Sequence, residues 1–152
     1  MRKFRVFVSA LVLSVLMSMS AFAGTEIGLN LDWKYAANSK INTGKAILFT
    51  SDAANKKGIT VAVNAGHGTK GGSSVKTLCH PDGSKKLTGG STATGAATVT
   101  AVSGGMQFAD GTSEAKVTLE VAKALGQKLL AEGYDVLMIR DGADVQLDNI
   151  AR

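Results

Sequence analysis

Cysteine is almost absent from this chain, and its absence limits how the fold can be held together. Cys79 is the only cysteine among 152 residues, so no disulfide can form within the chain. A domain without disulfides must be stabilised by its hydrophobic core, and a bound metal ion is the other support open to it.

Hydrophobic runs long enough to cross a membrane are also lacking. The most apolar stretch, Val6–Met17, is shorter than the roughly 20 residues that span a bilayer. It follows the basic start MRKFR and precedes small residues that include the cleavage pattern AFA. We therefore predict a secretory signal peptide at Met1–Ala23, cleaved before Gly24. The mature protein is then expected to be secreted or extracytoplasmic, without a transmembrane segment.

Strong charge is a third missing feature. The whole chain carries +5, and the predicted signal peptide holds three positive charges and no negative one, which leaves +2 on the mature part. So small a charge argues against nucleic acid as a partner, because nucleic-acid binding depends on clustered positive side chains. The charge is compatible with an anionic cell-wall polymer as a partner.

The most informative stretch of the chain is Ile59–Gly72, ITVAVNAGHGTKGG. Its first five residues are apolar and mostly β-branched, which predicts a short buried strand rather than a helix. Gly66 and Gly68 then flank His67 and free the backbone to turn. An imidazole at the carboxyl end of a buried strand lies where α/β sheets bind their ligands.

Two other interpretations of this stretch compete with a ligand-binding histidine. A single histidine is commonly a hydrogen-bonded structural residue, but such a residue rarely needs glycine on both sides. Gly66 and Gly71 have the outer spacing of a phosphate-binding loop, yet Gly72 stands where that motif needs lysine. We therefore set nucleotide binding aside and keep His67 as a candidate ligand.

Ser113–Ala131 has the clearest helical periodicity in the chain. Thr112 or Ser113 can cap its start, and Gly133 can end it. Glu114 opens the helix, where a carboxylate either stabilises the helix dipole or serves as a metal ligand. The period predicts one buried stripe, widened by Ala122 and Leu130, that consists of Val117, Val121, Leu125 and Leu129.

Tyr134–Ile139 contains the apolar run VLMI and predicts a second strand. Strand, helix and strand in this order form a βαβ unit, in which the strands are parallel and the crossover is right-handed. Arg140 follows the second strand directly, and Val145–Arg152 has the pattern of the start of another helix. We therefore expect an α/β fold with three α/β/α layers around a central, mostly parallel sheet, truncated after this second strand.

Two segments of the mature chain lie outside this unit. Residues 24–58 form an amino-terminal extension with short strands, one of them predicted at Ala46–Thr50 after a turn. Trp33 and Tyr35 in this extension either pack on a hydrophobic edge, which we favour, or bind sugar.

The second such segment, residues 73–112, is a Gly-, Ser- and Thr-rich insertion. We expect it to face solvent and to rim the site, because it leaves the strand of His67 and returns just before Glu114. Cys79 and His80 within it are expected to be loop residues rather than metal ligands, since no matching Cys/His spacing lies nearby.

These features together resemble a known family. VAVNAGHGTKGG, a glutamate that opens an amphipathic helix, and GYDVLMIRDGADVQLDNIAR are similar to the amino-terminal half of a zinc-dependent N-acetylmuramoyl-L-alanine amidase. The resemblance makes residues 59–152 an incomplete catalytic domain. The chain departs from the family in having Asn64 where aspartate is frequent, and in the insertion that lengthens the spacing from His67 to Glu114.

The resemblance implies a set of site residues and a reaction. It makes His67 and Glu114 zinc ligands, and Arg140 and Arg152 structural or substrate-side residues. The third ligand, a histidine, and the catalytic glutamate would lie beyond Arg152, so this chain alone is expected to be inactive. The implied reaction is hydrolysis of the amide between N-acetylmuramic acid and L-alanine in peptidoglycan by a zinc-activated water, with the glutamate as general base.

Two hypotheses from other classes stay open. The chain could be a non-catalytic cell-wall-binding module, or a truncated product without activity. The sequence downstream of Arg152 distinguishes them, because a histidine in an apolar strand and a later glutamate would favour the enzyme. Oligomeric state, biological role and stem-peptide preference are not set by the sequence.

Overall fold

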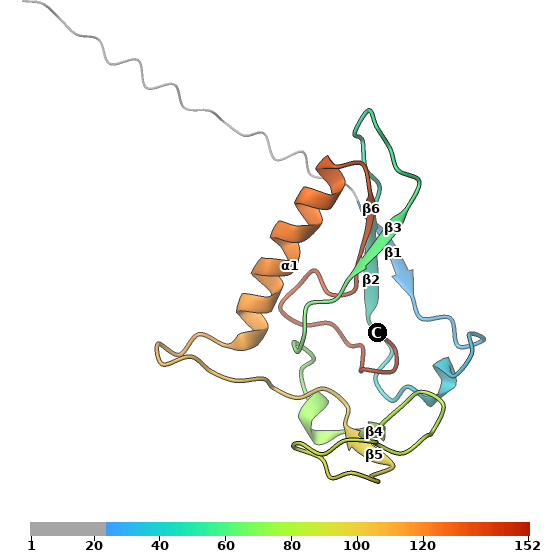
Figure 1. Cartoon of the computed structure of the whole chain (residues 1–152), viewed down its shortest axis with the longest axis vertical. Coiled ribbons are helices and arrows are strands. Elements are labelled where there is room, and N and C mark those ends of the chain that lie inside the picture. Colours follow the sequence, from blue (N-terminus) through green and yellow to red (C-terminus); the bar gives the residue numbers. More distant parts are fainter. Residues whose placement is uncertain (1–23) are drawn as a thin grey trace, which may run out of the picture.

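The computed structural model describes residues 24–152, and the predicted signal peptide lies outside the described residues. This part of the chain contains the helices and strands shown in Figure 1. The strands are β1 (Thr25–Gly28), β2 (Lys45–Phe49), β3 (Thr60–Val63), β4 (Lys76–Leu78), β5 (Thr98–Thr100) and β6 (Asp135–Met138). The helices are the 3-10 turns η1 (Ala36–Asn38) and η2 (Gly72–Ser74), and the α-helix α1 (Glu114–Ala131). Within residues 24–152, no helix is long and apolar enough to cross a membrane.

Four strands form the main sheet in the order β1-β2-β6-β3. β3 and β6 are parallel, with Val63 opposite Met138, which confirms the parallel pairing predicted for the two strands around the helix. β2 is antiparallel to both β1 and β6. The α/β class is therefore confirmed. The mostly parallel sheet in three layers is not, because one of the three strand pairs is parallel and α1 is the one α-helix of the described chain.

α1 begins and ends where the sequence predicts. The Ser113 hydroxyl accepts a hydrogen bond from the backbone N–H of Lys116 at 3.3 Å, which satisfies one of the free donors of the first turn. At the other end Gly133 has φ 93°, a left-handed conformation that glycine adopts without cost.

The face that α1 buries is one residue away from the predicted stripe. Val121 and Leu125 are 63% and 47% exposed, whereas Ala122, Gly126 and Leu130 are buried. The reason is a close approach of helix and sheet, since a Cβ built on Gly126 would lie 3.3 Å from the sulfur of Met138. The helix therefore turns its small residues to β6. The prediction is confirmed for Ala122, Leu129 and Leu130, which lie in or against the core, and is wrong for Val121 and Leu125.

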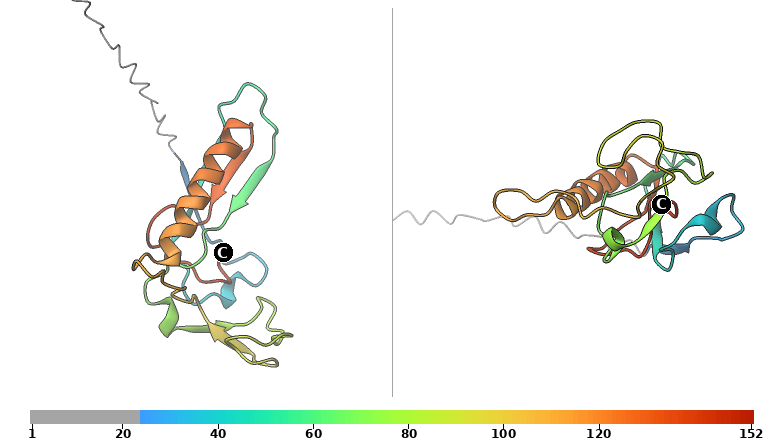
Figure 2. Two further views of the ribbon diagram at one scale, coloured as in Figure 1. Left: turned by 60° about the vertical axis from the view of Figure 1, so that its left-hand side comes forward. Right: turned by 90° about the horizontal axis from the view of Figure 1, so that it is seen from below.

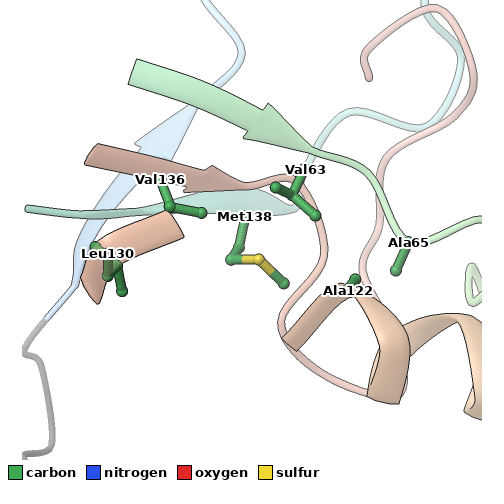
Figure 3. Close-up of a cluster of buried hydrophobic side chains, with 6 residues drawn as sticks. All are labelled: Val63, Ala65, Ala122, Leu130, Val136 and Met138. Carbon is green, nitrogen blue, oxygen red and sulfur yellow. The ribbon is translucent and has the colours of Figure 1, made fainter. Parts of the chain in front are cut away.

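The core between α1 and the sheet is small and well packed (Figure 3). Val136 on β6 is fully buried, and burial of a valine contributes about 1.5–3 kcal/mol to stability. Phe49, Val61, Leu119 and Leu129 pack around the cluster from its edges. The members of the cluster are Val63, Ala65, Ala122, Leu130, Val136 and Met138.

The other face of the sheet is covered by the carboxyl-terminal segment rather than by a helix. Its apolar cluster consists of Ala46, Ile139, Val145 and Leu147, with Leu137 and Ala151 packed against it. The helix predicted from Val145 is wrong in its start, because one turn forms only at residues 149–151. The Asp148 carboxylate sets this start by accepting the backbone N–H groups of Ile150 and Ala151 at 3.0 and 2.9 Å, as a helix N-cap does.

The amino-terminal extension is an integral part of the main sheet. The strand predicted at Ala46–Thr50 is confirmed as β2, which begins one residue earlier and lies between β1 and β6. The buried Asp148 carboxylate also accepts hydrogen bonds from the Ser39 hydroxyl and from the backbone N–H of Lys40, at 2.9 and 2.6 Å. The extension and the carboxyl-terminal segment are therefore joined by a buried charged group as well as by the sheet.

The insertion is anchored by a sheet of its own. β4 and β5 pair antiparallel, with Thr77 opposite Val99, at the same end of the molecule as the carboxyl ends of β3 and β6 (Figures 1 and 2). Ala101 and Val102 behind β5 are 0% and 3% exposed. The expectation that the whole insertion faces solvent is therefore wrong for its base, which packs against the body of the protein.

Trp33 and Tyr35 lie at the surface. They are 56% and 41% exposed, in the loop between β1 and β2. Neither ring belongs to the buried core, and the choice between packing on an edge and binding sugar stays a prediction.

Removing the tip of the β4–β5 loop is expected to leave the fold intact. Lys86 closes the tip, because its N–H donates to Ala96 O at 2.9 Å and its carbonyl accepts from Gly95 N at 2.8 Å. Replacing residues 87–94 by the turn Asn-Gly should change the free energy of unfolding by less than about 1 kcal/mol, since loop-closure entropy depends on the logarithm of length. Urea unfolding checks this, and loss of a cooperative transition would show that the tip belongs to the core.

Candidate functional site

His67 lies in a tight turn just beyond the carboxyl end of β3. Its φ is 63° and that of Gly68 is 71°, so two successive residues adopt the left-handed conformation. This conformation is uncommon for a residue with a side chain, and such positions cluster at functional sites. A Cβ on Gly66 would meet nothing within 4 Å, so of the two flanking glycines it is Gly68 that the turn requires.

The side chain of Arg140 supports this turn. Its side chain is fully buried, and a Cβ on Gly68 would lie 2.6 Å from its Nε atom. The guanidinium donates to the carbonyl oxygens of Ala65 and Gly66 at 3.2 and 2.9 Å, and to that of Ala115 in α1 at 2.9 Å. Burial lowers the pKa of Arg140, but a guanidinium remains charged at any ordinary pH. Arg140 thereby ties the turn to the start of the helix.

Arg152 holds the same turn from the other side. Its guanidinium donates to Ala65 O at 3.0 Å, to His67 O at 2.8 Å and to the Thr69 hydroxyl at 2.8 Å. Burial lowers the pKa of Arg152, and the positive charge of Arg140 lowers it further. Both arginines direct their donors at the backbone around His67, which makes them supports of the turn.

Glu114 reaches His67 from the first turn of α1. Its Oε1 atom lies 3.2 Å from His67 Nε2, and its Oε2 atom accepts the backbone N–H of Met106 at 2.8 Å. The Met106 N–H lowers the pKa of Glu114, and His67 lowers it further against the opposing effect of desolvation. The carboxylate is therefore ionised at neutral pH and faces the imidazole.

The returning end of the insertion, residues 103–106, lies against both side chains. Ser103 places its carbonyl oxygen 2.9 Å and its hydroxyl 3.1 Å from His67 Nδ1. Gly105 has φ 80°, and a Cβ on it would lie 3.0 Å from Glu114 Oε2 and 3.1 Å from the imidazole ring. Only a glycine lets the backbone pass so close, so this segment positions the imidazole and the carboxylate together.

The His67–Glu114 pair has the chemistry of two metal ligands. A carbonyl oxygen only accepts, so the bond to Ser103 places a hydrogen on Nδ1. The Nε2 atom then either donates a second hydrogen to the carboxylate, as in the ion pair of a protonated imidazole, or offers a lone pair. Two electron-rich atoms at 3.2 Å need a proton or a cation between them. Ligands at about 2.0–2.1 Å from a tetrahedral zinc are about 3.3 Å apart, so the pair fits one edge of such a site.

A complete metal centre is not assembled by the described part of the chain. Among residues 24–152, no group of three or more His, Cys, Asp or Glu side chains is placed to hold a metal ion. Cys79 and His80 lie in the loop after β4, as expected, and no hydrogen bond or ion pair within the described range joins them to His67 or Glu114. With Lys86, Leu87, Thr88 and Val99 they line a shallow hollow of about 160 Å³ in the insertion.

Three contributors to the site were not found from the sequence: Ser103, Gly105 and Met106. Met106 acts through its backbone N–H, and Ser103 through its carbonyl oxygen as well as its hydroxyl. Backbone groups are present in every residue, so these contacts leave little signal in the sequence. The Gly104-Gly105 doublet was the one visible sign of a turn at this point.

The described residues thus define a mixed α/β protein. A His–Glu pair with the chemistry of metal ligands lies at the carboxyl ends of its two parallel strands. The family model described as N-acetylmuramoyl-L-alanine amidase matches residues 61–152, and the chain belongs to this family. The family recognised from the sequence motifs is thereby confirmed. Comparisons with curated proteins and with solved structures gave no match. The family is one of peptidoglycan amidases, generally zinc-dependent and typically extracytoplasmic.

Gly105→Ala is expected to disturb the site while the fold persists. The added methyl group would meet both side chains of the pair, and alanine at φ 80° is itself strained by about 1 kcal/mol. The distance of 3.2 Å between His67 Nε2 and Glu114 Oε1 should increase, because both side chains lose their support. Long-range ¹H–¹⁵N NMR should show His67 losing its single tautomer, with His80, the only other histidine, as internal reference.

Gly104→Ala is the matched control for this experiment. A Cβ at Gly104 meets nothing within 4 Å, so the tautomer of His67 should stay as in the parent chain. Equal behaviour of the two variants would show that residues 103–106 do not position the pair.

Proposed function

We propose that this chain is the amino-terminal part of an exported, zinc-dependent N-acetylmuramoyl-L-alanine amidase. One observation supports it above all: His67 Nε2 and Glu114 Oε1 lie 3.2 Å apart, within the residues that the family model matches. They come from a strand end and a helix start 47 positions apart, and a βαβ crossover brings them to one edge of the sheet. A nitrogen and a carboxylate oxygen are donors that suit zinc.

The chemistry follows from the donor set. A bound zinc supplies a water of lowered pKa and polarises the carbonyl of the bond to be cut. His67 and Glu114 hold the ion, and residues 103–106 keep both side chains aimed at it. Arg140 and Arg152 keep the backbone of the His67 turn in place. The bond hydrolysed is the amide between the lactyl group of N-acetylmuramic acid and L-alanine.

Two ligands are too few for a catalytic zinc, which needs three protein ligands and one open position. We place the third ligand, a histidine, and the glutamate general base in sequence that follows Arg152. The proposal also includes export by a signal peptide at Met1–Ala23.

The test compares this chain with a form extended through its downstream reading frame. The 152-residue chain should bind zinc weakly and release no peptide from purified peptidoglycan, whereas the extended form should bind about one zinc and release peptides that begin with L-alanine. Zinc is measured by atomic absorption and the released peptides by mass spectrometry. Stoichiometric zinc and hydrolysis in the short chain would contradict the division of ligands. A zinc-loaded extended form without hydrolysis would favour a non-catalytic wall-binding module.

A further inference from the structure

A cluster of large exposed side chains lies on the loop between β1 and β2. Leu31, Trp33 and Tyr35 are 55%, 56% and 41% exposed. Single exposed apolar residues are common on protein surfaces, but three within five positions of one loop are not explained by packing. Two of the three are Trp and Tyr, whose rings carry a polar group. Such residues are enriched at binding surfaces, where the ring contacts the ligand and the polar group contacts water.

The loop is held in a defined shape. The N–H of Trp33 donates to Asn30 O at 3.1 Å, and the N–H of Ala36 donates to Trp33 O at 2.9 Å. Tyr35 has φ 67°, the left-handed conformation, which is unfavourable for a bulky side chain and is found where function requires it. The aromatic rings are therefore carried on an ordered backbone, so little conformational entropy would be lost when they bind a ligand.

The insertion supports the same loop. The side-chain amide of Asn38, just after Tyr35, donates to Pro81 O at 2.8 Å. This bond joins the aromatic loop to the insertion whose returning end contacts His67 and Glu114. The aromatic loop and the candidate metal ligands thus both contact the insertion, at different points along it.

The sheet register brings this loop to the same end of the sheet as His67. β1 ends at Gly28 opposite Lys45, and β2 runs antiparallel to β6, so the β1–β2 loop lies at the carboxyl ends of β6 and β3. Figure 1 shows η1, which follows Tyr35, at the end of the sheet where α1 begins. β1 and β3 are three strand spacings apart in the sheet, which corresponds to about 14 Å.

We propose that Trp33 and Tyr35 form a binding surface for the sugar rings of the peptidoglycan glycan strand, a polymer of N-acetylated amino sugars. The choice of polymer rests on the proposed function. A polymeric substrate must extend past the point of hydrolysis, and the loop that carries these residues lies, like His67, at the carboxyl ends of β3 and β6. Flat aromatic rings pack on the apolar C–H faces of pyranose rings. The ammonium of Lys34, 4.9 Å from the centre of the Tyr35 ring, adds a donor for acetamido or carboxylate oxygens.

Trp33 offers a direct readout, because it is the only tryptophan in the chain. The full chain is titrated with a tetramer of β-1,4-linked N-acetylglucosamine in the presence of EDTA, so that no metal-dependent hydrolysis occurs. Saturable enhancement or blue shift of tryptophan fluorescence, with protection from acrylamide quenching, is the expected result. Unchanged fluorescence and quenching up to saturating tetramer and with purified peptidoglycan would overturn the proposal.

Variants test the two rings separately in sedimentation with purified peptidoglycan. Trp33→Ala and Tyr35→Asn should each weaken binding about tenfold, and asparagine is chosen because it tolerates the left-handed conformation at this position. Ile59→Ala removes an apolar side chain of similar exposure, 54%, just before the amino end of β3 and away from the loop, and should leave binding unchanged. An equal loss in all three variants would overturn the proposal as general hydrophobic adhesion.

The outcome is separable from that of the proposed function. His67→Ala should leave the fluorescence response to the tetramer intact, because the glycan surface needs no metal. Amide hydrolysis by the extended form without any glycan response would overturn the glycan surface alone. A glycan response without hydrolysis would leave the surface standing and remove the amidase.

Discussion

His67→Ala in the form extended past Arg152 is expected to reduce amide hydrolysis to background and to remove most of the bound zinc. The imidazole is held in place by the left-handed turn and by its bond to Ser103, so its loss removes an ordered ligand from the site. Glu114→Ala should have the same effect. Loss of either ligand leaves two protein ligands where a catalytic zinc needs three.

Two further variants separate the role of the metal ligands from general damage. Glu114→Gln keeps the size of the side chain and an oxygen for the Met106 N–H, so α1 should remain as stable while the zinc content falls. His80→Ala removes the other histidine, which lies in the insertion, and should change neither zinc content nor hydrolysis. Zinc is measured by atomic absorption beside release of peptides that begin with L-alanine. Full activity in His67→Ala would end the amidase interpretation.

Arg140→Met is expected to lower the free energy of unfolding by at least about 3 kcal/mol, because several buried carbonyl oxygens lose a charged donor worth about 1–3 kcal/mol each. That is a large part of the roughly 5–15 kcal/mol that stabilises a typical domain. Arg140→Lys should recover little of the loss, since one ammonium group cannot donate to all the carbonyl oxygens that the planar guanidinium reaches at once.

Urea unfolding followed by the circular dichroism of α1 measures this effect. Lys123→Met is the control, because Lys123 makes an exposed ion pair with Asp141 at 3.3 Å in the same region. Its loss should change stability by less than about 1 kcal/mol. Comparable losses for the two variants would show that the buried arginine is not a structural centre of the site.

The parts of the fold that depend on neighbouring residues could be predicted from the sequence. The β-branched run predicted β3, and the strand after the helix predicted β6. Ser113 and Gly133 predicted both ends of α1, because capping involves residues a few positions apart. The glycine beside His67 predicted a turn for the same reason. The two candidate ligands were named from the family resemblance, and the structure brings them within 3.2 Å of each other.

The buried face of α1 could not be predicted in this way. Periodicity predicted one stripe that contains Val121 and Leu125 and is widened by Ala122 and Leu130. The sheet shifts the buried face toward Ala122, Gly126 and Leu130, because small residues let the helix approach Met138 closely. The exposed positions of Trp33 and Tyr35 were missed for a related reason, since composition alone favours burial of aromatic residues.

By itself, then, the sequence determined the local elements, the family and the two residues that carry the proposed chemistry. The tertiary structure decided that β2 enters the sheet beside β6, that Arg140 and Arg152 hold the His67 turn, and that residues 103–106 close over the pair. The physical reason is distance along the chain. The bond between Ser103 and His67 joins residues 36 positions apart, and that between Arg140 and Gly66 joins residues 74 apart. Such contacts depend on the path of the whole backbone, and many of them are made to carbonyl and N–H groups that every residue possesses.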